Sequence, residues 1–265
     1  MPDSTLQIPA PANEPPDEVV LAFFRRLLPD FYFVNAPLSR MRRHFSIIER
    51  LPREPVILDF FRPSGAQSTT LTLCAHDDAQ PGLLSKVVGT LTALKINVHT
   101  AWIHTLSDPH APQSGRRVIL DTLILSESKF GRSRPLTPTT QDEVIAAFRP
   151  IFGAPDAEMP LLSRALRLTR APLVIHDLSA SPAAHGLTLL TLSTADATGV
   201  LFRATRALAA LHLNVAHAQV NTSENTVDDV FFVSKADGTA LTSEEYAPLI
   251  AQLRHLLQSE IAPTA

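Results

Sequence analysis

Cysteine, long apolar runs and an excess of either charge are what this 265-residue sequence lacks. Its one cysteine, Cys74, excludes an intrachain disulfide and fits a reducing compartment. Because its neighbours are apolar, Cys74 is predicted to be a buried small side chain rather than a nucleophile. The 23 basic and 26 acidic residues give a net charge of −3, too near neutral for a protein dedicated to nucleic acid or to acidic membranes. No apolar run approaches the roughly 18 residues of a membrane span, and the acidic, proline-rich start is unlike a signal peptide, so we expect a cytoplasmic protein with no membrane partner.

Motifs of several enzyme classes are missing as well. The chain has no glycine-rich phosphate loop, no Gly-Ser with paired aspartates as in nucleotidyltransferases, and no spacing that indicates a Ser–His–Asp triad. Two dipeptides, His76-Asp77 and His176-Asp177, resemble the metal-binding dipeptide of phosphohydrolases, but both lie in or beside predicted strands rather than on a helical bundle. His99 and His104 are predicted on opposite faces of one strand, where they do not readily chelate one ion together. We therefore expect no enzyme activity, no metal and no cofactor.

What the sequence does contain is one pattern that occurs twice. Residues 71–99 alternate apolar and polar positions, pass through a turn that ends at Gly82, continue with apolar residues at helical spacing, and restart an extended run at Ile96. The same pattern begins again at Leu187. A constant difference of 117 in residue number indicates an internal repeat. It relates Gly82 to Gly199, Leu91 to Leu208, Ile96 to Leu213, Asn97 to Asn214, and Val98 to Val215.

Each copy is predicted to run strand, helix, strand, strand, helix. Asp121 and Asp229 are offset by only 108, because the loop over residues 107–117 makes the first copy nine residues longer there. Capping-box spacing predicts the start of the last helix in each copy, at Thr140 with Glu143 and at Thr242 with Glu245. Residues 168–173 could supply the strand that closes the sheet of the first copy. Alternatively, the two copies exchange their closing strands. This order predicts the α+β class and a ferredoxin-like arrangement, with both helices on one face of an antiparallel sheet.

The turn that opens each first helix is the candidate binding element. Unpaired backbone N–H groups at a helix start suit a carboxylate. Asp77, Asp78 or Asp196 could accept hydrogen bonds from an ammonium group, and the strand-start residues Asn97 and Asn214 could bind a side-chain amide. The alternative is that the aspartates cap the helices and the asparagines only satisfy the turns.

These motifs carry a resemblance to the ACT domain, a small-molecule-sensing module. The first copy has Pro81-Gly82-Leu83-Leu84 after an acidic turn and then Ile96-Asn97-Val98, and the second adds residues 227–233 and Asp237-Gly238. The order most resembles the C-terminal ACT pair of the PII-protein uridylyltransferases, bacterial nitrogen sensors, and an approach segment with Phe31-Tyr32-Phe33, Pro37 and His44 extends the likeness to residues 28–257.

The resemblance implies two ferredoxin-like βαββαβ ACT domains and no catalytic domain. It further implies a regulatory protein of nitrogen or amino-acid metabolism that senses an amino acid, glutamine being favoured, and signals to a protein partner. Such domains pair within one chain or in a homo-oligomer. The expected layout is a disordered tail at 1–16, a helical segment at 17–55, the first ACT domain at 56–153, a linker at 154–170 and the second ACT domain at 171–265.

Both turns depart from the family's Asp-x-Pro-Gly. The 117 offset places Ala79 where the first copy needs its aspartate, and Thr198 replaces proline in the second copy. If only one turn binds a ligand, the second, at Asp196, is the predicted one. The residues predicted to bind ligand are Asp77, Asp78, Gln80, Gly82, Leu83, Asn97, Asp196, Thr198, Gly199, Val200 and Asn214.

Two other functions use the same strand order. An RNA-binding module would stack bases on sheet aromatics, for which Phe231 and Phe232 are candidates, but the neighbouring Asp228 and Asp229 would repel phosphate. A protein-interaction scaffold needs no ligand at all. The sequence favours the sensor over both.

Overall fold

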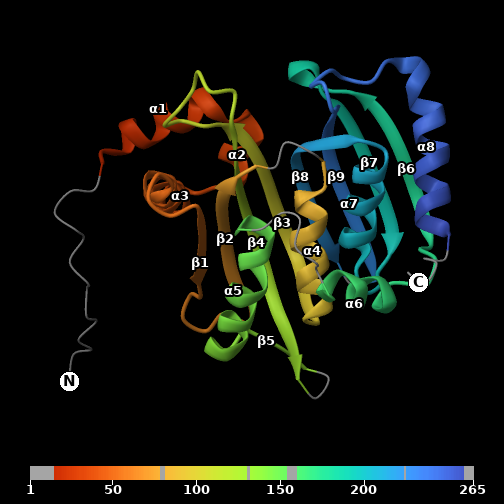
Figure 1. Cartoon of the computed structure of the whole chain (residues 1–265), viewed down its shortest axis with the longest axis horizontal. Helices are drawn as coiled ribbons and strands as arrows, with labels where there is room; N and C mark the ends of the chain where they lie inside the picture. The colour runs from red at the N-terminus through yellow and green to blue at the C-terminus, as the bar shows by residue number, and fades with distance from the viewer. Residues whose placement is uncertain (1–14, 78–80, 130–131, 154–159, 224, 260–265) are drawn as a thin grey trace. The chain divides into compact units, whose positions relative to one another are not determined.

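The computed structural model describes residues 15–77, 81–129, 132–153, 160–223 and 225–259. The chain divides into two compact units, Met1–Glu49 and Arg50–Ala265, and both copies of the repeat lie in the second unit (Figure 1). Most of the predicted tail at 1–16 lies outside the described residues.

The first unit is helical. It contains α1 at Asp17–Leu27, α2 at Asp30–Asn35 and nearly all of α3, which spans Leu38–Arg50. The hydroxyl of Tyr32 and Nδ1 of His44 lie 2.9 Å apart and are buried. Burial lowers the pKa of His44 to about 3, so its ring is neutral at physiological pH.

The second unit is built on one antiparallel sheet, which within the described residues has nine strands in the order β1-β2-β4-β3-β8-β9-β7-β6, with β5 paired to β4. The two copies lie side by side, and the pairing of β3 with β8 joins them (Figure 1). Of the two expected pairings, within one chain or between chains, the structure contains the pairing within the chain. The elements are β1 Val56–Phe61, β2 Thr69–His76, α4 Leu83–Ala93, β3 Ile96–Ser107, β4 Arg117–Lys129, β5 Arg132–Arg134, α5 Pro138–Gly153, α6 Pro160–Leu168, β6 Ile175–Pro182, η1 Ala184–Gly186, β7 Thr188–Ala195, α7 Val200–Ala210, β8 Leu213–Ser223, β9 Thr226–Lys235 and α8 Ser243–Gln258.

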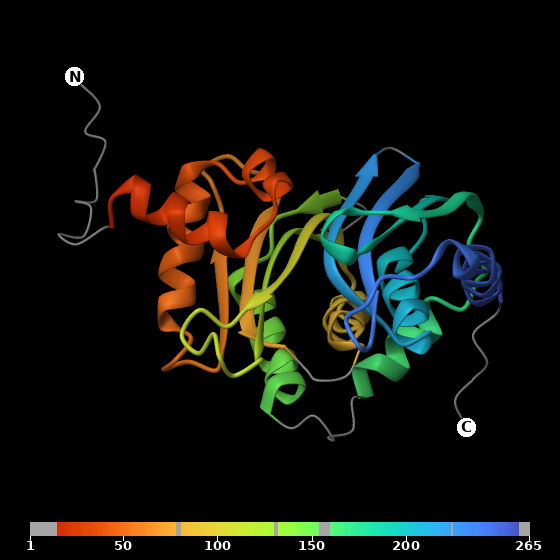
Figure 2. The ribbon, with the colours of Figure 1, turned by 90° about the horizontal axis from the view of Figure 1, so that it is seen from above.

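Helices α4 to α8 cover one face of this sheet, as the view from above shows (Figure 2). Alternate strand residues such as Leu71, Leu73 and Val233 are fully buried in the core they share with the helices. Helices α4 and α7 approach closely at Gly89, where an added Cβ would lie 2.6 Å from the ring of Phe202. The predicted α+β class and ferredoxin-like arrangement are confirmed.

The fourth strand of each copy precedes the rest of the copy instead of following it. β1 pairs with β2, and β6 pairs with β7, so each copy reads strand, strand, helix, strand, strand, helix. The predicted closing strand at 168–173 is wrong, because α6 continues to Leu168 and the next strand starts at Ile175. Between them the carbonyls of Thr169 and Ala171 accept hydrogen bonds from Arg203, which holds this segment out of the sheet.

One of the two predicted helix caps is confirmed. Thr242 and Glu245 form a capping box at α8, and the N–H of Thr242 donates to Oε2 of Glu245 at 2.7 Å. The cap of α5 is displaced, because the helix begins at Pro138 and Oγ1 of Thr137 accepts the N–H of Thr140 at 3.3 Å. Proline suits the first helical position, where its missing N–H has no intrahelical partner to lose.

Burial settles two expectations about single side chains. Cys74 has 0% of its surface exposed, as predicted, and burial raises its pKa to about 12. Phe231 is 2% exposed and packs beneath α7 and α8. Phe231 therefore cannot stack a base, and the RNA-binding alternative loses one of its two aromatics.

A buried arginine ties the ends of the second copy together. Arg203 in α7 is 3% exposed, and its guanidinium donates to five carbonyls. Two belong to Thr169 and Ala171, and three belong to Leu256, Leu257 and Ser259 at the end of α8. The last carbonyls of a helix carry the negative end of its dipole, so they stabilise the cation in place of water.

Replacing Arg203 by methionine is expected to lower the free energy of unfolding by roughly 2–4 kcal/mol, because the buried carbonyls lose their donor. Urea denaturation followed by circular dichroism measures the loss. Arg206→Met, at an exposed position on the same helix, is the control and is expected to stay within about 0.5 kcal/mol of the parent. Equal losses in the two variants would contradict the structural role of Arg203.

Each copy also buries a carboxylic acid at an equivalent strand position. Asp229 in β9 is 1% exposed, and its carboxyl group has no side-chain partner among the described residues; an interaction with the backbone of Asn221 offsets only part of the effect of burial. Burial, with a smaller contribution from the charge of Asp228, raises the pKa of Asp229 to about 8. Burial likewise raises the pKa of Asp121 well above its usual range.

The buried acid predicts a pH-dependent stability. Between the unfolded-state pKa near 3.8 and the folded-state pKa near 8, the unfolded chain has released a proton that the folded chain still holds at Asp229. The free energy of unfolding therefore falls as pH rises through this window, by up to about 1.4 kcal/mol per pH unit for one group. Asp229→Asn is expected to flatten this slope in denaturation experiments, whereas Asp228→Asn, at an exposed position, removes only the smaller charge contribution and is expected to leave most of the slope. An unaltered slope in Asp229→Asn would disprove the assignment.

Candidate functional site

The pairing of β3 with β8 places each predicted binding turn against the other copy. In this register Trp102 lies opposite Gln219. Asn97, at the start of β3, then shares a cavity with the turn before α7, and Asn214, at the start of β8, shares one with the turn before α4. Each candidate site is therefore built from both copies. The sequence alone did not decide which asparagine joins which turn.

The turn Asp196–Gly199 borders a cavity of about 420 Å³, here called the second cavity. This volume is within the range of roughly 300–1,000 Å³ that is typical of small-molecule sites. Five of the predicted residues line the cavity: Asn97, Asp196, Thr198, Gly199 and Val200. Its other lining residues are Val88, Thr92, Lys95, Ile96, Val98, His99, Ala197, Leu201, Val220, Thr222 and Val227.

The start of α7 lies in the wall of the second cavity. Gly199 adopts the left-handed conformation, with φ of 74°, and a Cβ added there would lie 2.3 Å from Cγ2 of Thr169. Within the described chain no side chain caps α7, so the alternative that Asp196 caps this helix is wrong. The N–H of Val200 donates to the carbonyl of Ala197 at 3.4 Å, so the next N–H groups of the first turn, together with the helix dipole, favour an anion at this wall.

The polar side chains around the second cavity are available for a ligand. Lys95, Asn97, Asp196 and Thr198 have no side-chain partner among the residues that the structure describes. Lys95 and Asn97 come from the first copy, and Asp196 comes from the second. The cavity thus offers an acceptor for an ammonium group on one side and hydrogen-bond donors on the other.

Among the lining residues that the sequence did not predict, Lys95 and His99 carry ionisable side chains. Lys95 follows α4 in the left-handed conformation, with φ of 60°. His99 lies at a β-bulge, and its Nε2 is 2.7 Å from Oγ of Ser126. β8 has a bulge at the equivalent place, beside His217. A bulge inserts one extra residue and re-aims the side chains beside it, and the apolar alternation of a single strand does not reveal where the bulge lies, which is why the sequence pattern missed His99.

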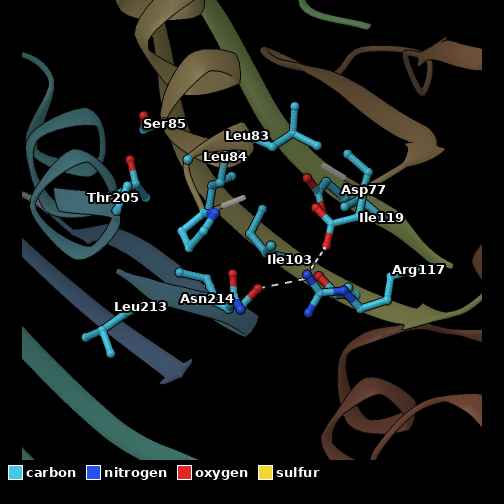
Figure 3. A pocket seen from close by; sticks show the side chains of 16 residues that line it. Asp77, Leu83, Leu84, Ser85, Ile103, Arg117, Ile119, Thr205, Leu213 and Asn214 are labelled. Atoms are coloured by element: carbon cyan, nitrogen blue, oxygen red, sulfur yellow. Dashed lines mark hydrogen bonds and ion pairs between the residues drawn. The ribbon is translucent and has the colours of Figure 1, made fainter. Parts of the chain in front are cut away.

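The turn before α4 borders a much smaller first cavity, of about 50 Å³ (Figure 3). Its polar groups already have partners. Nη2 of Arg117 lies 3.0 Å from Oδ2 of Asp77, and Nδ2 of Asn214 donates to the carbonyl of Lys235 at 3.4 Å. Four predicted residues line this cavity, namely Asp77, Gly82, Leu83 and Asn214. The predicted Asp78 and Gln80 lie outside the described residues.

Backbone hydrogen bonds show how the two turns correspond. The N–H of Asp77 donates to the carbonyl of Arg117 at 2.9 Å, and the N–H of Asp196 donates to the carbonyl of Asn225 at 2.8 Å. Asp77 is therefore the structural counterpart of Asp196. Burial and the nearby charge of Asp77 both raise the pKa of Asp121, which also lines the first cavity.

The constant offset of 117 is wrong before the turn. Asp77 and Asp196 differ by 119 residues, whereas Gly82 and Gly199 differ by 117. The first turn is two residues longer, so Ala79 does not stand in place of the aspartate. The offset of 117 was derived from residues in the helix and in the strand that follows it. It therefore could not reveal two extra residues in the turn that precedes the helix.

Among the described residues, no three His, Cys, Asp or Glu side chains gather closely enough to hold a metal ion. No helix in this part of the chain is both long and apolar enough to cross a bilayer.

Comparison with known proteins identifies the second copy. Residues 188–247 match the ACT domain family. The bifunctional uridylyltransferase/uridylyl-removing enzyme of Rhodospirillum rubrum is 30% identical over 204 residues, covering 76% of this chain and 21% of the relative. That of Pasteurella multocida is 24% identical over 87% of this chain and 25% of its own length, and that of a Bradyrhizobium species is 28% identical over 87% and 24%.

The chain spans about a fifth to a quarter of the length of these relatives. A solved aspartate kinase from Synechocystis aligns with 74% of this chain and 41% of its own, at 12% identity and a TM-score of 0.19, which is too low to support an inference. The repeat, the fold and these relatives agree: the chain is a tandem ACT-domain protein that resembles the C-terminal regulatory region of the bacterial PII-protein uridylyltransferases.

Proposed function

We propose that this chain is a non-catalytic regulatory protein that binds an amino acid in the second cavity. One observation carries the proposal: a roomy cavity between the copies brings an unpaired carboxylate, an uncapped helix start and unpaired donors together. No one of these features would be enough, since a helix start or a surface aspartate is common. Their convergence matches the charged ends of an amino acid.

Each end of the ligand has a suitable group. Its carboxylate accepts hydrogen bonds from the first N–H groups of α7, where the helix dipole favours negative charge. Its ammonium donates to Asp196, and such charge-assisted hydrogen bonds are stronger than neutral ones. Its side chain then extends toward Asn97 and Lys95 of the first copy. A side chain that ends in a carbonyl oxygen, as in glutamine, suits both of these donors.

Glutamine is the first ligand to test, and it comes from the family resemblance rather than from the cavity. The relatives are named as uridylyltransferase/uridylyl-removing enzymes, which supports a role in nitrogen metabolism. In this proposal the protein works in the cytoplasm and passes its state to a protein partner. A ligand that bridges the two copies changes how firmly they are joined, and this change is what the partner reads.

Calorimetry and thermal-shift measurements with each of the amino acids test the proposal. Glutamine or a close relative is expected to raise the melting temperature of the parent chain. Asp196→Asn and Asn97→Ala, changed on opposite walls of the second cavity, are each expected to weaken binding roughly 10- to 100-fold, because each removes a polar contact to the ligand.

Asp228→Asn supplies the matched control, because it removes an exposed aspartate of the second copy that does not line the cavity. It is expected to bind like the parent chain. If no amino acid shifts the melting temperature or gives heat on titration, the sensor function is refuted and a protein-interaction scaffold is the better reading. If Asp196→Asn binds as tightly as Asp228→Asn, the ligand sits elsewhere.

A further inference from the structure

The two cavities have the same architecture, yet among the described residues only the first has a cationic side chain paired with the aspartate of its turn, since Lys95 of the second cavity forms no ion pair with Asp196. Arg117 begins β4, and its guanidinium is aimed at the carboxylate of Asp77 across the first cavity (Figure 3). The Asp77 side chain is 15% exposed and the Arg117 side chain 39% exposed, so the pair is partly shielded from water. This carboxylate is the counterpart of Asp196, the proposed acceptor of the ligand's ammonium.

The difference between the cavities lies in one pair of equivalent residues. Arg117 and Asn225 hold the same position, because their carbonyls accept the N–H groups of Asp77 and Asp196. Asn225 carries no charge and cannot neutralise a carboxylate. Asp196 therefore has no ionic partner among the described residues, whereas Asp77 has one.

The remaining groups of the first cavity agree with this difference. Asn214 is 9% exposed and already donates to the carbonyl of Lys235, whereas the side chain of its counterpart Asn97 is exposed and has no partner within the described part of the chain. The first cavity has about 50 Å³ of free space, against about 420 Å³ for the second. Buried Asp121 also lines the first cavity, so a second carboxyl group lies near the cation.

We propose that Arg117 is a built-in substitute for a ligand's cationic group, and that the first cavity is a latent site for a small molecule that carries an ammonium or guanidinium group. A guanidinium donates to a carboxylate as an ammonium does, with a geometry that matches both oxygens. The chain then has one exchangeable site and one that is permanently self-occupied. The exchangeable site in the second cavity rests on the proposed function, whereas the role of Arg117 in the first cavity does not.

Chemical rescue tests the substitution without knowledge of the ligand. In Arg117→Ala, millimolar methylguanidinium chloride is expected to raise the melting temperature by about 2–4 °C by binding at the vacated position. The parent chain and Arg117→Lys, which keeps a cation, are expected to show no such rise. The double variant Asp77→Asn with Arg117→Ala lacks the carboxylate and is expected to lose the rescue.

Arg116→Ala is the matched control, because Arg116 precedes Arg117 and pairs with a different carboxylate, Asp108, at 3.1 Å. A similar rise in Arg116→Ala, or rescue that survives in the double variant, overturns the proposal. If Arg117→Ala does not fold, Arg117→Gln replaces it, because it keeps most of the side-chain stem. Methylguanidinium is expected to raise the melting temperature of this variant in the same way. No rescue in either variant also overturns the proposal.

Titration with glutamine separates this proposal from the proposed function. One site in the parent chain and two in Arg117→Ala support both. One site in each chain overturns the latent site and leaves the sensor function intact. No binding to the parent chain refutes the sensor function, while the methylguanidinium experiment still decides whether Arg117 occupies a cation site.

Discussion

The antiparallel pairing of β3 with β8 is the contact on which the rest of this structure depends. It converts two small sheets into one, brings helices α4 and α7 together at Gly89, and sets the start of each strand against the binding turn of the other copy. Without it, Asn97 and Asp196 would not share a cavity. The candidate sites are therefore properties of the pair of copies and not of either copy alone.

The two copies have diverged where they contact each other. A two-residue insertion, an arginine in place of an asparagine and a tightly bound Asn214 distinguish the first turn from the second. These changes leave the cores of both copies intact, since each keeps its buried aspartate and its glycine at the helix start. The two copies thus share one fold and differ in the chemistry of their turns.

The sequence was informative where a pattern repeats and uninformative where contacts are distant along the chain. Apolar periodicity and the 117 offset are local signals, and they predicted the strands, the helices and the α+β arrangement. The origin of each fourth strand depends on which segment pairs with the edge of the sheet, and this is β1 in the first copy and β6 in the second. Arg203 holds residues 168–173 outside the sheet, because it donates both to the carbonyl of Ala171 and to that of Ser259, which is 56 residues away in the sequence. No local sequence pattern indicates such a contact.

In the candidate site, too, the sequence predicted local features and missed those that depend on contacts distant along the chain. Glycine and aspartate at the turns were recognisable from their types, and Asn97 and Asn214 from the repeat. The crossed partnership of turn and asparagine, the bulge at His99 and the pairing of Arg117 with Asp77 all arise from strand register. Register is set by the whole sheet, so these features became visible only with the structure.

A cavity shared between two copies also changes what an occupant does to the molecule. Whatever spans from Asp196 to Asn97 acts as a non-covalent cross-link between two halves that also contact each other at β3 and β8 and at helices α4 and α7. At a hundred times its dissociation constant, such an occupant adds about 2.7 kcal/mol to the work of separating the halves. The strength of a junction inside the chain would then rise and fall with the concentration of a metabolite outside it.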